Sequence, residues 1–270
     1  MHNHIKDPKH MTRKTALPRH LFEMRPAVLA AAVISLGLAA TPAAGQSTIL
    51  IDFGFTNDQM PSPNTDSNYW NNVTQTDATS GSGGAVGNSL ALVASDNSAS
   101  GITLTMTDLF ENENSTGTTA APTTSVSAFN FTELGTDSLF IADGNPDAAF
   151  TLTGLNSANT YRFTLFAARS GVSDVRSAEY SFTGSATDTV ELDAANNTSA
   201  VVTTAALAPD ASQTITFSMQ KAASNTNGSG FAYLGGMQVE VIPEPSAAAF
   251  VLWSGLCLLL RRGYRAAHPA

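Results

Sequence analysis

Within residues 46–242, the side chains that could do chemistry are carboxylates, because this stretch contains no histidine and no cysteine. The histidines of the chain are His2, His4, His10, His20 and His268, and the single cysteine is Cys257. This excludes a serine or cysteine nucleophile activated by histidine, zinc bound by histidine or cysteine, haem and iron–sulfur clusters. A carboxylate pair, a cation held by oxygen ligands, or no chemistry at all remain.

Several aspartates stand in predicted loops or at predicted strand ends: Asp52, Asp66, Asp143, Asp147 and Asp193. Calcium takes six to eight oxygen ligands and suits such loops, but no EF-hand spacing is present. The run Asp143-Gly-Asn-Pro-Asp147 is equally an ordinary turn. We therefore expect no catalytic residue, no cofactor and no defined metal ligand, and we leave a structural calcium ion open as an alternative.

The charge of this stretch is strongly acidic, with four basic residues against nineteen Asp and Glu, a net charge of −15. A surface that acidic repels a phosphate backbone, so nucleic-acid binding is excluded. The basic residues are Arg162, Arg169, Arg176 and Lys221. We expect the arginines to neutralise nearby carboxylates, with Arg169 lining a ligand cleft as the alternative.

An aromatic pair, Tyr69 and Trp70, lies in the polar stretch 64–72. Aromatic faces can stack on sugar rings while neighbouring Asn and Asp bond the hydroxyl groups, so the pair is a candidate glycan contact. The alternative is that Trp70 packs in the hydrophobic core, as large aromatic side chains commonly do.

The elements that would position these residues are short segments with period-two alternation, recurring about every ten residues. They are 48–53, 102–106, 150–153, 161–166, 178–182, 189–192, 200–203, 214–219 and 237–241. No long amphipathic helical pattern interrupts them. This indicates an all-β, antiparallel sandwich of the jelly-roll type over residues 46–241 as a single domain.

The amino-terminal region is typical of a secretory signal peptide covering residues 1–45. A basic stretch ends at Arg25, an apolar run of 14 residues covers 27–40, and small residues follow. We expect signal peptidase to cut between Gly45 and Gln46, and the apolar run to form a signal helix. Because Met24 is followed by a compact signal of its own, we hypothesise that Met24 is the true start.

The carboxyl-terminal region has three parts, with Pro243, Glu244 and Pro245 at the centre of the first (242–246). The prolines lack N–H donors and fix φ, so we expect the tripeptide to stay extended and outside any sheet. Residues 247–260 form an uncharged, mostly apolar run, about 21 Å long as a helix. The basic tail 261–265, with Arg261 and Arg262, then marks the cytoplasmic side.

This tripartite tail, 242–265, resembles a PEP-CTERM sorting signal. The resemblance implies recognition of Pro243, Glu244 and Pro245 by an exosortase, a membrane-embedded processing enzyme. It also implies a transmembrane helix at 247–260 before processing and a cytoplasmic stop at Arg261 and Arg262. The family's usual Val before the first proline is Ile242 here. The protein would then pass through a membrane-anchored intermediate to the cell surface or extracellular matrix.

The body is similar in several segments to galactose-binding-like and malectin-like jelly rolls. These segments are 51–54, 69–72, 150–166 and 231–241, where a strand ending in Gly-Leu turns into an aromatic-rich strand. We therefore expect a non-enzymatic, exported surface or matrix protein, with exopolysaccharide as a conceivable partner. The alternatives are a carbohydrate-binding module and, less favoured, a glycoside hydrolase or lyase, for which no carboxylate spacing stands out.

Overall fold

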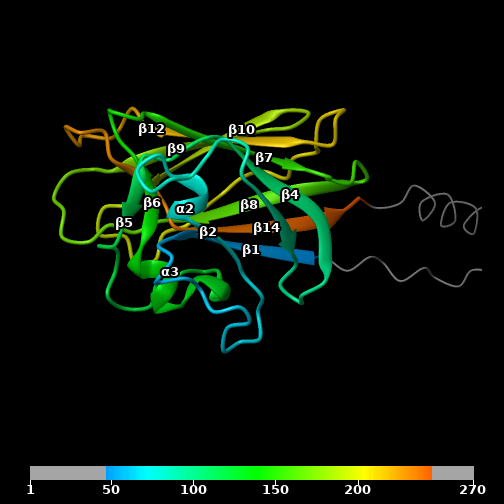
Figure 1. The fold of residues 1–270 in the computed structure, drawn as a ribbon, viewed down its shortest axis with the longest axis horizontal. Helices are drawn as coiled ribbons and strands as arrows, with labels where there is room; N and C mark the ends of the chain where they lie inside the picture. The colour runs from blue at the N-terminus through cyan, green and yellow to red at the C-terminus, as the bar shows by residue number, and fades with distance from the viewer. Residues whose placement is uncertain (1–46, 245–270) are drawn as a thin grey trace, which may run out of the picture. The chain divides into compact units, whose positions relative to one another are not determined.

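Residues 47–244 are described by a computed structural model, and their alternating segments form an all-β fold of antiparallel sheets (Figure 1). The described part begins with β1 (Ser47–Gly54) and its last strand is β14 (Gly236–Pro243). The predicted signal peptide (1–45) and transmembrane helix (247–260) lie outside the described residues. Among the residues that are described, no helix is long and apolar enough to cross a bilayer.

The first sheet has five strands in the order β11-β8-β14-β1-β2. Besides β1 and β14 it contains β8 (Asn159–Phe166), β11 (Val202–Thr203) and β2 (Asn71–Thr74). All neighbours are antiparallel except β1 and β2, which are parallel. Because β1 and β14 are neighbours, the first and last strands of the domain lie side by side, with Ser47 opposite Val241.

The second sheet has six strands in the order β10-β9-β12-β7-β4-β3, all antiparallel. Its members are β3 (Ser89–Val93), β4 (Ala99–Asp108), β7 (Asp147–Thr153), β9 (Ser177–Thr183), β10 (Thr187–Asp193) and β12 (Ile215–Lys221). Figure 1 shows this layer above the five-stranded sheet. The two sheets therefore form a β-sandwich.

Short elements complete one end and one face of the sandwich. A three-stranded sheet has the order β13-β6-β5, with β13 (Ala232–Leu234), β6 (Ser138–Ile141) and β5 (Asn112–Asn114). The helical turns are α2 (Gln75–Ala78), the 3₁₀ turn η1 (Ser127–Phe129) and α3 (Thr132–Thr136).

The main core lies between the two large sheets and is rich in stacked aromatic rings. Phe163 of β8 stacks on Phe182 of β9 with ring centroids 4.0 Å apart, and Phe150 of β7 stacks on Phe217 of β12 at 4.3 Å. Phe53 of β1 reaches across to Phe150 at 5.7 Å. The contacts follow from alternation, which directs every second side chain of each strand toward the facing sheet.

A second, smaller core covers the outer face of the five-stranded sheet. It consists of Leu50, Met60, Trp70, Phe129, Leu134, Phe166 and Ala168. Alternation within 161–166 assigns Phe166 to the face opposite Phe163, and on that face Phe166 is 0% exposed. The segment after β1 and the segment containing η1 and α3 supply the covering residues, so this sheet is buried on both faces around Leu50 and Phe166.

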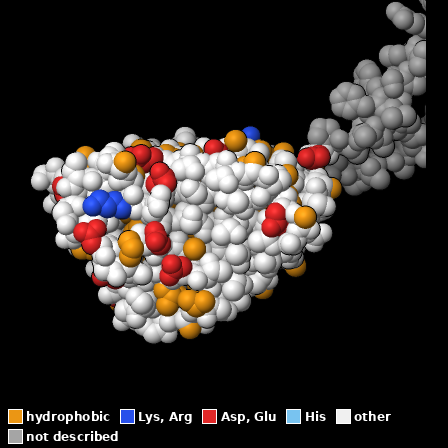
Figure 2. All heavy atoms as spheres, turned by 90° about the horizontal axis from the view of Figure 1, so that it is seen from above, with side chains coloured by type: hydrophobic (Ala, Val, Ile, Leu, Met, Phe, Trp, Pro, Cys, Tyr) orange, Lys and Arg blue, Asp and Glu red, His pale blue; other side chains and the backbone are white. Residues whose placement is uncertain are grey.

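The outer face of the six-stranded sheet is not covered by another layer, and it presents hydroxyl groups to solvent. One complete row of register partners crosses all six strands: Ser89, Thr105, Thr151, Thr216, Thr183 and Thr187. Neighbouring hydroxyl groups bond one another, as in Thr183 with Thr187 at 3.0 Å. Threonine favours strands because its branched side chain fits the pleated surface. Figure 2 shows this side with few charged groups away from one end.

We expect Phe217→Ala to lower the free energy of unfolding by about 3–5 kcal/mol, because the ring is fully buried and its loss leaves a cavity. Phe217→Leu should cost less, since it retains part of the volume. Val86→Ala is the control, because Val86 is 63% exposed and should change stability by less than about 0.5 kcal/mol. Urea denaturation measures all three. Equal effects at 217 and 86 would contradict the assigned core.

Candidate functional site

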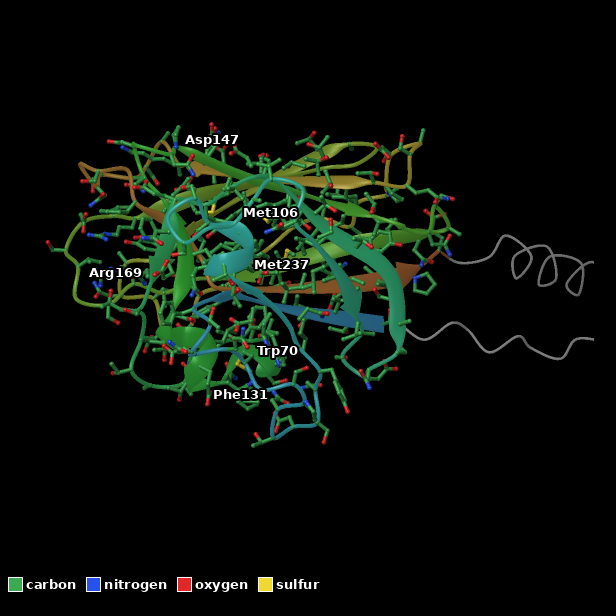
Figure 3. All side chains as sticks on the ribbon, in the orientation of Figure 1. Trp70, Met106, Phe131, Asp147, Arg169 and Met237 are labelled. Carbon is green, nitrogen blue, oxygen red and sulfur yellow. The ribbon has the colours of Figure 1, made fainter. Side chains whose placement is uncertain are left out.

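The predicted glycan contact at Trp70 is wrong in this structure, because the indole is buried. Trp70 is 3% exposed and packs in the second core, with its ring 6.4 Å from that of Phe129. Ser62 fixes it there, since its hydroxyl bonds both the N–H and the carbonyl of Trp70 at 2.9 Å. Figure 3 shows Trp70 near Phe131 on the α3 side of β1. A ring enclosed in this way cannot stack on a sugar, and Tyr69 beside it is only half-buried.

The first proline of the predicted sorting motif belongs to the sheet, which corrects the expectation that the tripeptide stays outside it. Pro243 is the last residue of β14 and lies opposite Asn159 of β8. Glu244 continues the pairing by donating its N–H to the carbonyl of Ala158 at 3.1 Å. A proline is tolerated at a strand end, where its missing N–H interrupts no further pairing. Pro245, Arg261 and Arg262 lie outside the described residues.

The aspartates considered as calcium ligands do not gather in one place. Asp52 is buried in β1, whereas Asp66 lies exposed in the loop that follows this strand. Asp143 approaches Lys221 at 3.9 Å, Asp147 begins β7, and Asp193 accepts N–H bonds from Arg176 and Ala195. Within residues 47–244, no three acidic, histidine or cysteine side chains are arranged to hold a metal ion.

Two of the arginines neutralise carboxylates as predicted, and the third does not. Arg162 pairs with Glu240 at 3.2 Å across β8 and β14, and Arg176 pairs with Asp174 at 3.2 Å. Arg169 instead donates to the backbone carbonyls of Thr116 and Ser170 at 3.1 and 2.6 Å. Its guanidinium therefore holds two loop segments together.

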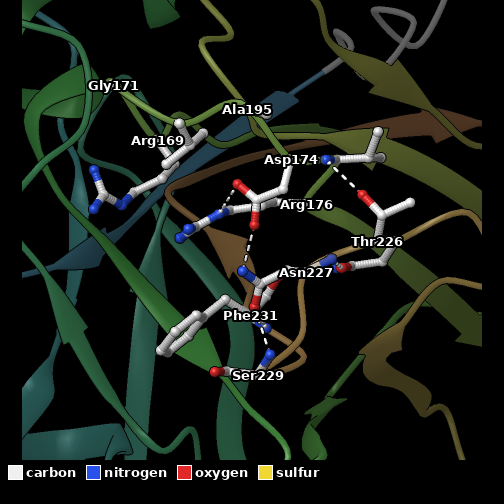
Figure 4. Close-up of polar contacts among 12 residues, drawn as sticks. Arg169, Gly171, Asp174, Arg176, Ala195, Thr226, Asn227, Ser229 and Phe231 are labelled. Atoms are coloured by element: carbon white, nitrogen blue, oxygen red, sulfur yellow. Dashed lines mark hydrogen bonds and ion pairs between the residues drawn. The ribbon is translucent and has the colours of Figure 1, made fainter.

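Arg176 also forms a cluster with aromatic rings at one end of the sandwich (Figure 4). Its guanidinium carbon lies 5.4 Å from the centre of the Phe231 ring, and its Nη1 donates to the Tyr233 hydroxyl at 2.6 Å. Asp174, its ion-pair partner, also accepts a bond from the Asn227 amide. The side chain of Arg176 is only 12% exposed. These contacts tie the loop before β9 to the loop before β13, so the cluster is structural.

An open pocket of about 220 Å³ lies between β2–α2 and the β3–β4 hairpin. Its lining combines apolar and polar side chains: Val73, Asp77, Asn88, Ser89, Leu90, Leu104 and Met106. Asp77 accepts bonds from the N–H and hydroxyl of Thr74 at 3.0 and 2.6 Å, and the Asn88 amide donates to the Asp77 carbonyl at 2.9 Å. The polar groups are thus held in place beside an apolar floor, as in small-ligand pockets.

Two carboxylates beside the outer face of β1 are almost completely buried, in contrast to the open pocket. Asp52 is 2% exposed, and Asp137, the residue after α3, is 1% exposed. Oδ2 of Asp52 accepts the N–H of Met60 at 2.9 Å, and Oδ2 of Asp137 accepts the N–H of Phe55. The Asp137 carboxylate lies against Gly54, where a Cβ atom would stand 2.6 Å from its Cγ. Any other residue at position 54 would force the Asp137 carboxylate to move.

Burial sets the protonation of this pair. It raises the pKa of Asp52 well above its ordinary value of 3.8. The neighbouring carboxylates of Asp137 and Glu133 raise that pKa further, whereas the hydrogen bond from the Met60 N–H lowers it. Burial likewise raises the pKa of Asp137 to about 7, with Asp58 adding to the rise and the Phe55 N–H opposing it. An isolated buried carboxylate is costly to ionise, which explains both directions.

Comparisons with known proteins identify no family for this chain. No family model matches it, and no curated protein does. Among solved structures, the ANXUR2 extracellular domain from Arabidopsis thaliana is 12% identical at a TM-score of 0.34, over 73% of this chain and 41% of that one. The ANXUR1 extracellular domain from the same plant is 10% identical at a TM-score of 0.36, over 63% and 55%. An exo-β-1,3-galactanase from Phanerochaete chrysosporium, solved with galactose, is 12% identical at 0.24, over 52% and 32%. This chain thus spans only about half or less of each.

We expect the metal-free protein, kept in a chelator, to lose stability as the pH rises from about 4 to 8. The folded state retains protons on Asp137 that the unfolded state has released, so raising the pH favours unfolding. A rise in pKa from 3.8 to about 7 corresponds to about 4 kcal/mol, at about 1.4 kcal/mol for each pH unit. Urea denaturation across this pH range measures the loss.

Asp137→Asn should reduce the pH dependence, because the replacement cannot ionise, while Asp52, whose pKa is also raised, keeps the remainder. Asp66→Asn is the matched control, since Asp66 is exposed and its replacement should leave the slope unchanged. Stability that is constant or rises between pH 4 and 8 in the wild type would contradict the buried pair.

Proposed function

We propose that this protein is a non-enzymatic, exported surface or matrix protein whose tail, 242–265, is read and processed by an exosortase. The observation that carries the proposal is the tail itself: Pro243-Glu244-Pro245, an uncharged apolar run and the arginines 261 and 262. A signal peptide cut between Gly45 and Gln46 would start the export. The body would be displayed as a β-sandwich, for which the jelly-roll assignment remains a prediction.

The boundaries of the fold support this proposal. β1 begins at Ser47, two residues after Gly45, and β14 ends at Pro243. Because Ser47 lies opposite Val241, the entry and the exit of the chain are at the same end of one strand pair. Cleavage at both predicted places would therefore remove no residue of either core.

The position of Glu244 gives the tail a defined exit from the domain. Its N–H is bound to the carbonyl of Ala158, so the sheet pairing extends to the second residue of the motif. We infer that the processing enzyme meets the motif directly at the domain surface rather than on a long tether. The membrane helix at 247–260 would hold the domain close to the bilayer until the cut is made.

The state of the carboxylates supports a non-enzymatic role. A hydrolase needs an acid of raised pKa within reach of its substrate. In residues 47–244 the two carboxyl groups whose pKa is raised are Asp52 and Asp137, and both are enclosed. A substrate could not reach either of them without opening the second core.

We expect protein released from producing cells to have an intact mass that runs from Gln46 to about residue 243–246. Glu244→Gln should block processing, because it removes the only charge of the motif, and the product should retain Cys257. Glu240→Gln is the matched control, since it lies four residues earlier on β14 and affects only surface contacts with Arg162 and Gln238. A released wild-type protein that still contains residues 247–265 would refute the proposal.

The second candidate function is a carbohydrate-binding module, favoured by the pocket between β2–α2 and the β3–β4 hairpin. A carboxylate and an amide stand there beside apolar side chains, and this combination can bond sugar hydroxyls while contacting the ring. This reading assigns exopolysaccharide as the partner and keeps the protein at the cell surface.

If the pocket binds a glycan, Leu90→Trp should narrow it and lower the affinity at least about tenfold, because Leu90 lies opposite Leu104 on the pocket side of β3. Ser218→Trp is the control, because Ser218 lies on the outer face of β12, away from the pocket lining. A polysaccharide array with both variants measures the effect. No glycan retained by the wild type, or equal loss in both variants, would remove this alternative.

A further inference from the structure

The second core contains polar oxygen atoms that no other group satisfies. Among the described residues, Oδ1 of Asp52, Oδ1 of Asp137 and Oδ1 of Asn72 are all buried and accept no hydrogen bond. Buried polar atoms are almost always paired, so three unsatisfied acceptors in one layer call for an explanation. When the two carboxyl groups are ionised, all three oxygens are acceptors only, and each needs a donor or a cation.

The strand geometry brings these three oxygens to one side of the sheet. Asn72 of β2 is the register partner of Asp52 of β1, so both side chains rise from the same face. Gly54 follows Asp52 by two residues, which places it on that face as well, and the Asp137 carboxylate rests against Gly54. The field of Asp137 also acts on Asp52. Three segments distant in sequence thus direct oxygens into a common region.

Further acids surround the region, and no basic side chain does. Glu133 of α3 acts on Asp52, and Asp58, from the loop after β1, acts on Asp137. The basic side chains of residues 47–244 are bound elsewhere: Arg162 to Glu240, Arg169 to backbone carbonyls, Arg176 to Asp174 and Lys221 to Asp143. A compensating positive charge must therefore come from outside the chain.

Neutral donors cannot supply that charge. Trp70 Nε1 and Asn64 Nδ2, which belong to the segment covering this face, are also buried without partners. They could share a water molecule with one of the oxygens. An N–H group or a water molecule satisfies a hydrogen bond, but it leaves two carboxylates without a counter-charge in a region of low polarity.

We propose that Asp52, Asn72 and Asp137 form a calcium-binding site that fastens the second core to the five-stranded sheet. Two carboxylates and an amide carbonyl are the oxygen ligands that calcium takes, and its six to eight ligands tolerate irregular geometry. Water molecules would complete the shell, and the charges of Asp58 and Glu133 would add to the negative field around the ion. The site is independent of the sorting tail, so its test is also independent of the proposed function.

The bound ion would replace the protons that the pair otherwise retains. With calcium present, both carboxylates ionise and their mutual repulsion becomes attraction to the shared cation. The ion would join β1, β2 and the segment after α3, and so stabilise the folded state by mass action. This also explains why acids are tolerated in a layer that otherwise consists of Leu, Met, Phe and Trp.

The test is thermal melting of the full-length purified chain at pH 7.5, first stripped with a chelator and then titrated with calcium chloride. At a hundredfold excess of calcium over its Kd, we expect the wild-type Tm to rise by about 5–10 °C. Asp52→Asn and Asp137→Asn should lose this rise, and the exposed Asp66→Asn should keep it. Magnesium chloride should act more weakly, because Mg²⁺ demands stricter geometry and retains its waters.

A second variant keeps the proposal falsifiable if the first two fail to fold. Asn72→Asp adds a carboxylate, so it should tighten calcium binding at least about threefold and lower the Tm of the chelated protein. Equilibrium dialysis with radioactive calcium should give one ion per wild-type chain. No binding and no shift in Tm would overturn the proposal, and so would binding lost in Asp66→Asn but kept in Asp52→Asn and Asp137→Asn.

Discussion

Both faces of β1 are buried, and the rest of the structure depends on this constraint. Ile49, Ile51 and Phe53 point into the main core, while Leu50 and Asp52 point into the second. A strand in a simple two-layer sandwich buries one face only. The segment after β1 and the segment around α3 must therefore cover the other face. The small third layer, the burial of Trp70 and the enclosure of Asp137 all follow from that covering.

The second core differs from the main core because two carboxyl groups are buried in it. The main core of stacked phenylalanines is held together by area and shape, which need no external partner. The second core includes Asp52 and Asp137, whose burial lowers stability unless a proton or a cation accompanies them. The attachment of this layer therefore depends on what accompanies the two buried carboxyl groups.

Two further features of the domain face solvent, namely the hydroxyl row and the two chain ends. The hydroxyl row across the six-stranded sheet offers no charge, although the described chain is strongly acidic. The strand pair β1–β14 places Ser47 and Val241 together, so that both chain ends leave from one end of the sandwich. The predicted cuts, after Gly45 and near residues 243–246, both lie outside the residues that form the two cores.

The alternating segments were predictable from the sequence because strand periodicity is a local property. Each of the nine expected strands is present, from β1 to β14. The short strands β2, β3, β5, β6 and β13 were missed, because three to five residues carry too little alternation. Pro243 was wrongly kept out of the sheet, since its place at a strand end depends on where β8 begins. The burial of Trp70 depends on packing against Phe129 from a distant segment, so neighbouring residues in the sequence did not reveal it.

The amino-acid sequence by itself thus determined the all-β class and the exclusion of histidine and cysteine chemistry from residues 46–242, and it supplied the prediction of a sorting tail. The tertiary structure alone decided which acids meet. Asp137 stands 85 residues after Asp52, and no spacing rule connects them. Their meeting depends on how the segment around α3 folds over β1, which is a consequence of packing between distant segments, whereas periodicity and composition report only on neighbours along the chain.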